Sequence, residues 1–151
     1  MKKVLSILLA LLLFCVLACY APHGEESTVI VNDLPGVYCE IVEGTLTPTG
    51  AEVRFWHTLD RDDLVTWPMH YLEKEYLGKW YPLEMAEMFP VDTVAYHIPP
   101  ESQMREKGHH YIWGDSYGTL EPGHYRVMFE VFEGTRPNRI MHIVATEFTI
   151  R

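Results

Sequence analysis

The chain has very little cysteine, with three residues in 151 at positions 15, 19 and 39. Cys15 lies within an apolar N-terminal run and Cys19 directly follows it, so Cys39 is the single thiol in the rest of the chain. Neither a disulfide framework nor the paired cysteines of a structural zinc site can therefore supply its stability. Any folded domain must depend on a hydrophobic core. Cys39 itself lies in an alternating apolar stretch, and we predict a buried structural thiol.

Sequence motifs for common cofactor and catalytic sites are also missing. There is no phosphate-binding P-loop, no dinucleotide-binding glycine pattern and no HExxH zinc motif. Gly114–Gly118 (GDSYG) places a serine among glycines and an acid, and we interpret it as a turn without a catalytic role. We therefore predict no catalytic residues and no cofactor, and we expect that the protein is not an enzyme.

The longest hydrophobic run is at the N-terminus and is too short to cross a bilayer. Two lysines precede Val4–Ala18, an apolar run of about 15 residues, whereas a spanning helix needs about 20. The run ends in Val16–Cys19 (VLAC), which resembles the lipobox of bacterial lipoproteins, where the cysteine is acylated and becomes the mature N-terminus. We predict a lipoprotein signal peptide at 1–18 and lipid attachment at Cys19. The alternative is ordinary cleavage after Ala18 or Ala21, which would release the protein.

The predicted anchor and the net charge together limit the partners. Two acyl chains hold a protein on a membrane lastingly, whereas one chain binds only marginally. The predicted localisation is therefore extracytoplasmic, on the bacterial cell membrane through the N-terminal lipid. The net charge of −9 would become −11 on loss of Lys2 and Lys3. Because this charge repels phosphate backbones, we expect no nucleic-acid partner.

Beyond residue 18 the sequence indicates a tether followed by one β domain. Residues 19–35 are predicted as the tether and residues 36–151 as the domain. Short alternating segments separated by turns are typical of strands. They lie at 36–43, 51–58, 69–76, 79–83, 91–98, 109–113, 123–132 and 139–150. Only Leu83–Phe89 and Pro100–Lys107 have a helical pattern, of one or two turns each. About seven to eight strands favour an antiparallel β-sandwich.

One motif carries a structural signature. Leu120–Val127 (LEPGHYRV) has the form Leu-x-Pro-Gly-x-Tyr-x-Val. This spacing suits a tyrosine corner, in which a tyrosine at the start of a strand bonds to backbone a few residues upstream. The predicted corner residues are Leu120, Pro122, Gly123 and Tyr125.

Around this motif the chain resembles a bacterial Ig-like domain common in small lipoproteins. The matching stretches occur in order, at Thr47–Phe55, Tyr71–Leu83, Ile98–Ser102 and Trp113–Val127. The resemblance implies an Ig-like sandwich used as a binding or spacer module, with Trp80 and Trp113 as structural aromatics. The chain is similar, more weakly, to the bacterial intracellular proteinase inhibitor family.

Three functions remain open at this level. The first is a membrane-anchored, non-enzymatic binding or envelope module. The second is an inhibitor of extracytoplasmic proteases that presents a loop such as Asp60–Pro68. The third is a metal-binding protein that uses strand histidines, with candidates at positions 23, 57, 70, 97, 109, 110, 124 and 142. For the first, an exposed aromatic patch is the expected surface for a protein or glycan partner. Its candidates are Trp56, Trp67, Tyr71, Tyr76, Tyr81 and Tyr111.

Overall fold

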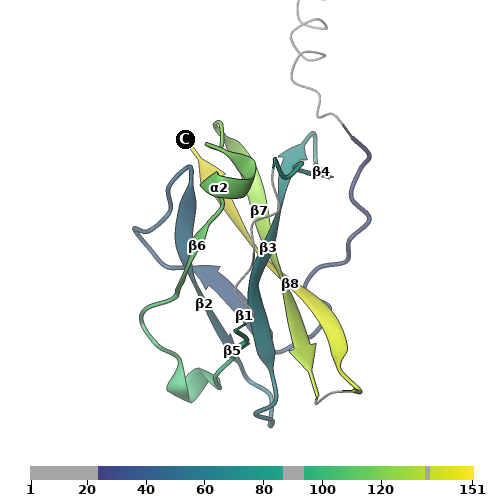
Figure 1. The fold of residues 1–151 in the computed structure, drawn as a ribbon, viewed down its shortest axis with the longest axis vertical. Coiled ribbons are helices and arrows are strands. Elements are labelled where there is room, and N and C mark those ends of the chain that lie inside the picture. The colour runs from purple at the N-terminus through teal and green to yellow at the C-terminus, as the bar shows by residue number, and fades with distance from the viewer. Residues whose placement is uncertain (1–23, 87–93, 135–136) are drawn as a thin grey trace, which may run out of the picture.

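Two antiparallel sheets pack face to face (Figure 1), in a computed structural model that describes residues 24–86, 94–134 and 137–151. The smaller sheet has the order β1-β2-β6, with bounds Val37–Ile41, Gly50–His57 and His109–Ile112. The larger has the order β4-β3-β7-β8, with bounds Lys79–Pro82, Val65–Tyr76, Gly123–Glu133 and Ile140–Ile150. A two-residue strand, β5 (Tyr96–His97), pairs with the start of β3. The predicted all-β antiparallel fold is confirmed.

Alternating side chains build the core between the sheets. In β2 every second residue from Ala51 to His57 is buried, and in β7 the inward positions include Val127, Phe129 and Val131. Phe55 and Phe129 meet edge to face across the two sheets, with ring centroids 5.0 Å apart. The two sheets therefore face each other through the residues that the period-two pattern predicts.

Several predicted elements differ from those observed. β3 starts at Val65 rather than at residue 69, because a register shift between Thr66 and His70 accommodates Pro68, which has no N–H to donate. Of the strand predicted at 91–98, residues 91–93 lie outside the described part. Among the described residues only Tyr96–His97 form a strand (β5), and Val94 is 52% exposed. The helical pattern at 100–107 yields a single 3-10 turn, η1 (Glu101–Gln103).

The second helical prediction, at 83–89, is not observed either. Residues 83–86 form no helix, and residues 87–89 lie outside the described part. The one α-helix among the described residues is a single turn, α2 (Gly114–Tyr117), between β6 and β7.

The segment before β1 crosses the outward face of the larger sheet. Ser27 N–H donates to the carbonyl of Trp80 on β4 at 2.8 Å, and Asn32 N–H donates to that of Ile143 on β8 at 2.6 Å. Since β3 and β7 lie between these strands, the connecting residues pass over them. Asn32 and Asp33 also accept hydrogen bonds from β8 backbone. The domain boundary predicted at residue 36 stays a prediction, but several residues before it are bonded to the sheet.

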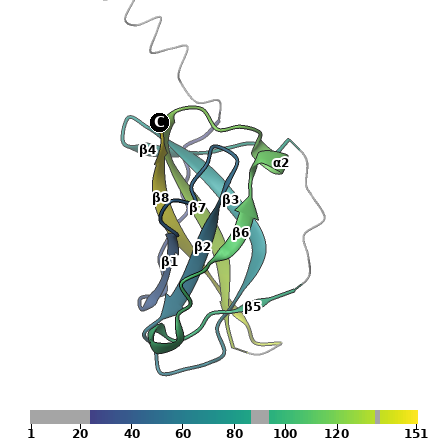
Figure 2. The ribbon, with the colours of Figure 1, turned by 90° about the vertical axis from the view of Figure 1, so that its left-hand side faces the viewer.

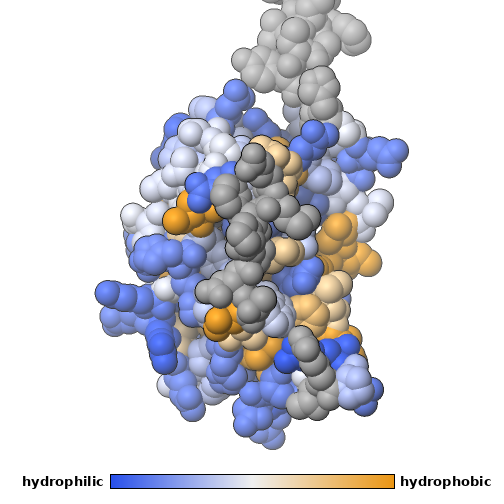
Figure 3. Space-filling view, viewed as in Figure 1, coloured by the Kyte–Doolittle hydropathy of each residue, from blue (hydrophilic) through white to orange (hydrophobic). Residues whose placement is uncertain are grey.

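The same side of the molecule carries exposed apolar groups. Figure 3 shows hydrophobic surface on the right of the view, where the N-terminal segment and β8 lie in Figure 1. The exposed apolar side chains on these two elements are Val29, Ile30, Ile140 and Met141.

A charged pair is buried on the outward face of the larger sheet. Arg126 Nε donates to Glu73 Oε2 at 2.6 Å, and both side chains are almost fully buried. The guanidinium of Arg126 also lies over the Trp80 ring, 4.7 Å from its centroid. Trp80 therefore packs against an ion pair outside the core rather than within it.

The residues of the predicted corner lie where β7 begins. The Tyr125 hydroxyl donates to the carbonyl of Glu121 at 2.7 Å, four residues upstream, which is the geometry of a tyrosine corner. The Tyr125 ring stacks on Phe148, which stacks in turn on Trp113. Trp113 is fully buried, and its Nε1 donates to the carbonyl of Pro48 at 3.1 Å. These rings close one end of the core.

Replacing Tyr125 with phenylalanine should lower the free energy of unfolding by about 1 to 2 kcal/mol, because the Glu121 carbonyl loses its donor. Denaturant unfolding measures this loss. The matched control is Tyr38→Phe, since the Tyr38 side chain is 45% exposed and its hydroxyl removal should cost less than about 0.5 kcal/mol. Equal effects in the two variants would contradict the structural role of the corner.

Candidate functional site: a basic pocket between two sheet edges

A pocket of about 320 Å³ lies between β2 of the smaller sheet and β3 and β5 of the larger sheet. Its floor comes from β2, one wall from β3 and β5, and the other from the connection between β5 and β6. Figure 2 shows β2, β6 and this connection on the near side. The lining residues are Arg54, Phe55, Thr66, Ala95, Tyr96, His97, Pro99, Gln103, Arg105, Lys107, Gly108 and His109.

The connection forms an arch because it touches β2 at two points and leaves it between them. At one end Gly108 lies against β2, so close that a Cβ there would sit 2.5 Å from the Val53 carbonyl. At the other end His57 N–H donates to the carbonyl of Pro99 at 3.0 Å. Strand pairing with β6 stops at Val53 and His109. One residue of the β2 edge, Phe55, therefore faces the pocket instead of a strand.

The alternation of backbone groups along β2 fixes which way Phe55 points. On the β1 side, the Glu52 carbonyl accepts from Val42 N–H at 2.9 Å and Thr58 N–H donates to the Gly36 carbonyl at 2.8 Å. His57 N–H points to the opposite side. Backbone groups alternate in direction along a strand. The N–H and C=O of Phe55 therefore point into the pocket, and no hydrogen bond joins them to a described residue across it.

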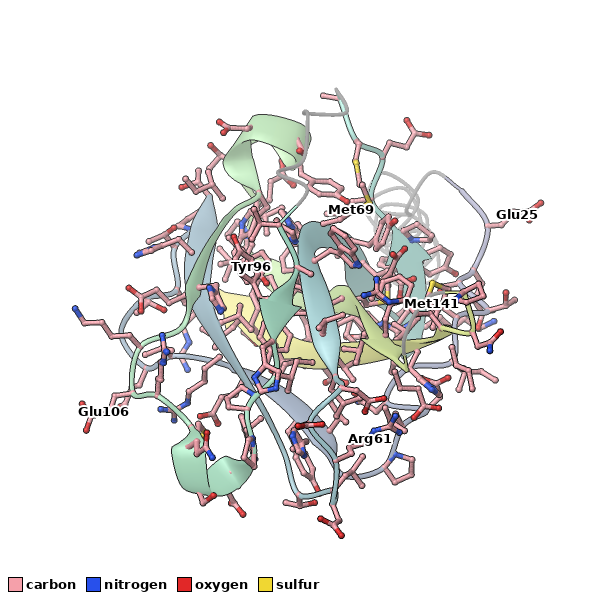
Figure 4. The ribbon with its side chains drawn as sticks, turned by 60° about the horizontal axis from the view of Figure 1, so that its bottom comes forward. Glu25, Arg61, Met69, Tyr96, Glu106 and Met141 are labelled. Atoms are coloured by element: carbon pink, nitrogen blue, oxygen red, sulfur yellow. The ribbon has the colours of Figure 1, made fainter. Side chains whose placement is uncertain are left out.

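The pocket is basic although the chain is acidic. Arg54, Arg105 and Lys107 line it, and no aspartate or glutamate does. Arg54 is paired with Glu40 on β1, whereas Arg105 and Lys107 have no ion-pair partner within the described ranges. Glu106 lies between these two cations in sequence, but its side chain points outward, away from the ribbon (Figure 4). The lining thus presents two unpaired cations to any anion that enters.

Two aromatic rings close the pocket between β5 and β6. Tyr96 and His109 stack with ring centroids 4.0 Å apart and an interplanar angle of 15°, and Figure 4 labels Tyr96 in this position. Burial lowers the pKa of His109, and the positive charge of Arg105 lowers it further. A neutral imidazole is therefore favoured until a negative charge enters the pocket. His97 is held separately, with Nε2 donating to the Asp62 carbonyl at 3.0 Å.

The histidines predicted as metal ligands lie apart. His57 and His70 are inside the sandwich, His110 is paired with Glu52 on the surface, and His23 lies outside the described residues. His124 and His142 each approach two carboxylates, from opposite ends of the larger sheet. No group of three or more histidine, cysteine or acidic side chains suited to a metal ion occurs in the described part. Metal binding stays a prediction without a located site.

Gly114–Gly118 has the Gly-x-Ser-x-Gly spacing of a nucleophile elbow, but its backbone does not have the geometry of that motif. Ser116 lies inside the turn of α2 rather than at a sharp, strained bend after a strand, and its φ is not positive. No described side chain is hydrogen-bonded to its hydroxyl. Its backbone carbonyl accepts a hydrogen bond from Ala86 N–H at 2.7 Å. Local structure therefore accounts for this motif.

The six aromatic residues predicted to be exposed do not form one patch. Tyr111 is 3% exposed and packs against Phe129, so its prediction was wrong. Trp56 lies on the smaller sheet, stacked on Tyr38 at 5.5 Å, whereas Trp67 lies on the larger sheet. The other three, Tyr71, Tyr76 and Tyr81, also belong to the larger sheet and are half-buried.

The loop considered for protease inhibition is shorter than predicted. Residues 65–68 belong to β3, and Leu64 is fully buried. Arg61 Nε donates to Asp63 at 2.6 Å, and Arg61 also pairs with Glu133 on β7. Only residues 60–63 are left as a loop, and they are tied to the sheet.

Cys39, the free thiol of the described part, lies on β1 and is the register partner of Phe55 on β2. Cys39 packs against the core, and burial, aided by the charge of Glu40, raises the pKa of its thiol well above the ordinary value. This environment fits a structural thiol rather than a reactive one. Cys19 is not among the described residues. In the part that is described, no helix has the length and apolar character needed to cross a membrane.

The pocket residues come from four separate segments, which explains why sequence reasoning missed them. Arg105 and Lys107 lie within a stretch predicted as helical, and Arg54 is about fifty positions away. The one local signal is the pair of cations two residues apart before Gly108. Comparison with known proteins adds no further signal, since no protein-family model, curated protein or solved structure matches the chain.

Substituting Arg105 with glutamine should raise the pKa of His109, because a positive charge that disfavours imidazolium is removed. The pKa should stay below the ordinary histidine value, since burial is the larger cause of its depression. An NMR titration of the His109 ring proton measures the shift. Glu106→Gln is the control on the same loop, and removal of that acid should not raise the pKa. No upward movement in Arg105→Gln would contradict the described geometry.

Proposed function

We propose that the protein is a membrane-anchored extracytoplasmic lipoprotein whose Ig-like domain is a non-enzymatic binding module for anionic ligands. The observation that carries the proposal is the pocket lined by Arg54, Arg105 and Lys107, without a lining acid, in a chain of net charge −9. Cations are scarce in this sequence. Two that have no described acidic partner face one pocket, where they would attract an anion.

The strand order supports the Ig-like part of the proposal. The order β1-β2-β6 corresponds to strands A, B and E of an immunoglobulin sandwich, and β4-β3-β7-β8 corresponds to C′, C, F and G. In such domains the tyrosine corner lies near the start of strand F. Here Tyr125 lies near the start of β7, the strand in the F position.

The sequence supports the anchored part. A basic start, an apolar run of about 15 residues and Ala18-Cys19 together fit export followed by acylation of Cys19. Two acyl chains would hold the domain at a membrane surface without a spanning helix.

The chemistry of the pocket supports binding over catalysis. Guanidinium and ammonium groups attract an anion but are not nucleophiles at neutral pH. The imidazole of His109 is stacked on Tyr96 and, among the described residues, no carboxylate orients it as a base. We infer that the lining holds a ligand rather than transforms it.

Mass spectrometry of the N-terminus of the native protein tests the anchor. We expect a mature chain that begins at Cys19 and carries a diacylglyceryl group, and this species should be lost in Cys19→Ala. Cys15→Ala is the control, since Cys15 leaves with the signal peptide and its substitution should not prevent acylation. A mature chain that begins at an unmodified Cys19 or at Pro22 would contradict the proposal. A separate experiment tests the pocket. Acetate added at constant ionic strength should bind near the two cations and shift the NMR resonances of His109.

A further inference from the structure

One feature of the pocket favours a particular class of anion. The floor offers the N–H donor and the C=O acceptor of Phe55, the same pair that a strand presents to its neighbour. A phosphate or sulfate could accept from the N–H but would meet the lone pairs of the adjacent carbonyl. A residue of an extended peptide satisfies both, since its own N–H and its own carbonyl or carboxylate oxygen point to the same side of the chain. The edge therefore favours a ligand that contains a peptide bond.

The arch limits how much of such a ligand can pair with β2. β6 occupies the edge up to Val53, and Pro99 occupies it at His57. A continuous strand cannot pass both contacts, because only the single position at Phe55 is open between them. The volume of about 320 Å³ is likewise near the small end of ligand pockets. The end of a peptide fits this geometry, whereas a longer added strand does not.

The charges decide which end of a peptide enters. An amino terminus carries a positive charge and would be repelled by Arg105 and Lys107. A terminal carboxylate would meet both cations, and its negative charge would favour protonation of His109 beside them. The neighbouring acids lie outside the lining. Glu101 is exposed, Glu106 points away from the ribbon, and Glu40 on β1 is already paired with Arg54.

We propose that the pocket binds the carboxyl terminus of a peptide. The N–H of its last residue donates to the Phe55 carbonyl, and its carboxylate accepts from the Phe55 N–H and is held by Arg105 and Lys107. This inference rests on the proposed function, because it names the ligand of the same pocket. Backbone pairing gives affinity without reading side chains. The pocket is therefore expected to accept several terminal sequences.

The experiment uses the full-length protein in detergent micelles and two arrays of random pentapeptides. One array ends in free carboxylates and the other in carboxamides of the same sequences. We expect binding to the free-acid array only. The double variant Arg105→Gln/Lys107→Gln should weaken binding about tenfold, since an ion pair made by an exposed cation contributes modestly. Glu106→Gln is the matched control on the same loop and should bind at least as well as the native protein.

A second measurement tests the backbone pairing, which a purely electrostatic site would not require. Hydrogen exchange at the Phe55 amide should slow when a bound pentapeptide is added, and N-methylation of the peptide's last amide should abolish both binding and protection. Failure of both arrays, equal binding of acids and amides, or an unprotected Phe55 amide would overturn the inference. Displacement by acetate as strong as by the peptide would identify a free small acid instead. The proposed function is tested by the N-terminal mass and the acetate response, and none of these outcomes changes either result. The two proposals can therefore be contradicted independently.

Discussion

The fold depends on the burial of one face of each sheet against the other. Phe129, Val144 and Trp113 are fully buried between the layers, and each large apolar side chain removed from water contributes about 1.5–3 kcal/mol. Because side chains alternate along a strand, a register slip of one residue would turn a whole inward set toward solvent. The inward sets of β2 and β7 therefore fix how the sheets pack, and because the described part contains no disulfide, this packing is its main source of stability. The aromatic contacts around Tyr125 and Phe148 close one end of the same core.

The outward face of the larger sheet also contains buried polar contacts. Glu73 and Arg126 are buried there as a pair, and removing one partner of such a pair typically costs 3–5 kcal/mol, because the other charge is left without compensation. Glu73 Oε1 has no hydrogen-bond partner among the described residues, so the pair is not fully satisfied. The segment before β1 passes over this face and bonds to β4 and β8.

The pocket arises because two paired strands differ in length. β2 has eight residues and β6 has four, so half of the β2 edge on that side lacks a strand partner. Pro99 and Pro100 favour an extended chain, which meets β2 at His57 and then departs as the arch. The arch carries Arg105 and Lys107 to the open edge. Backbone hydrogen-bonding groups and positive charge thus coincide at one position, in a chain with more acidic than basic residues.

The sequence by itself determined the all-β class, the approximate limits of most strands and the corner motif, because these depend on local alternation and on turn residues such as Pro122 and Gly123. It also pointed to an apolar N-terminal run that ends at Cys19. It did not reveal that β3 continues through Pro68 or that Tyr111 is buried, because a bulge and packing against the opposite sheet decide these features. The ion pair of Glu73 and Arg126 and the pocket at Phe55 depend on tertiary structure alone. Their members come from strands and loops far apart in the chain, and only strand order and register bring them together.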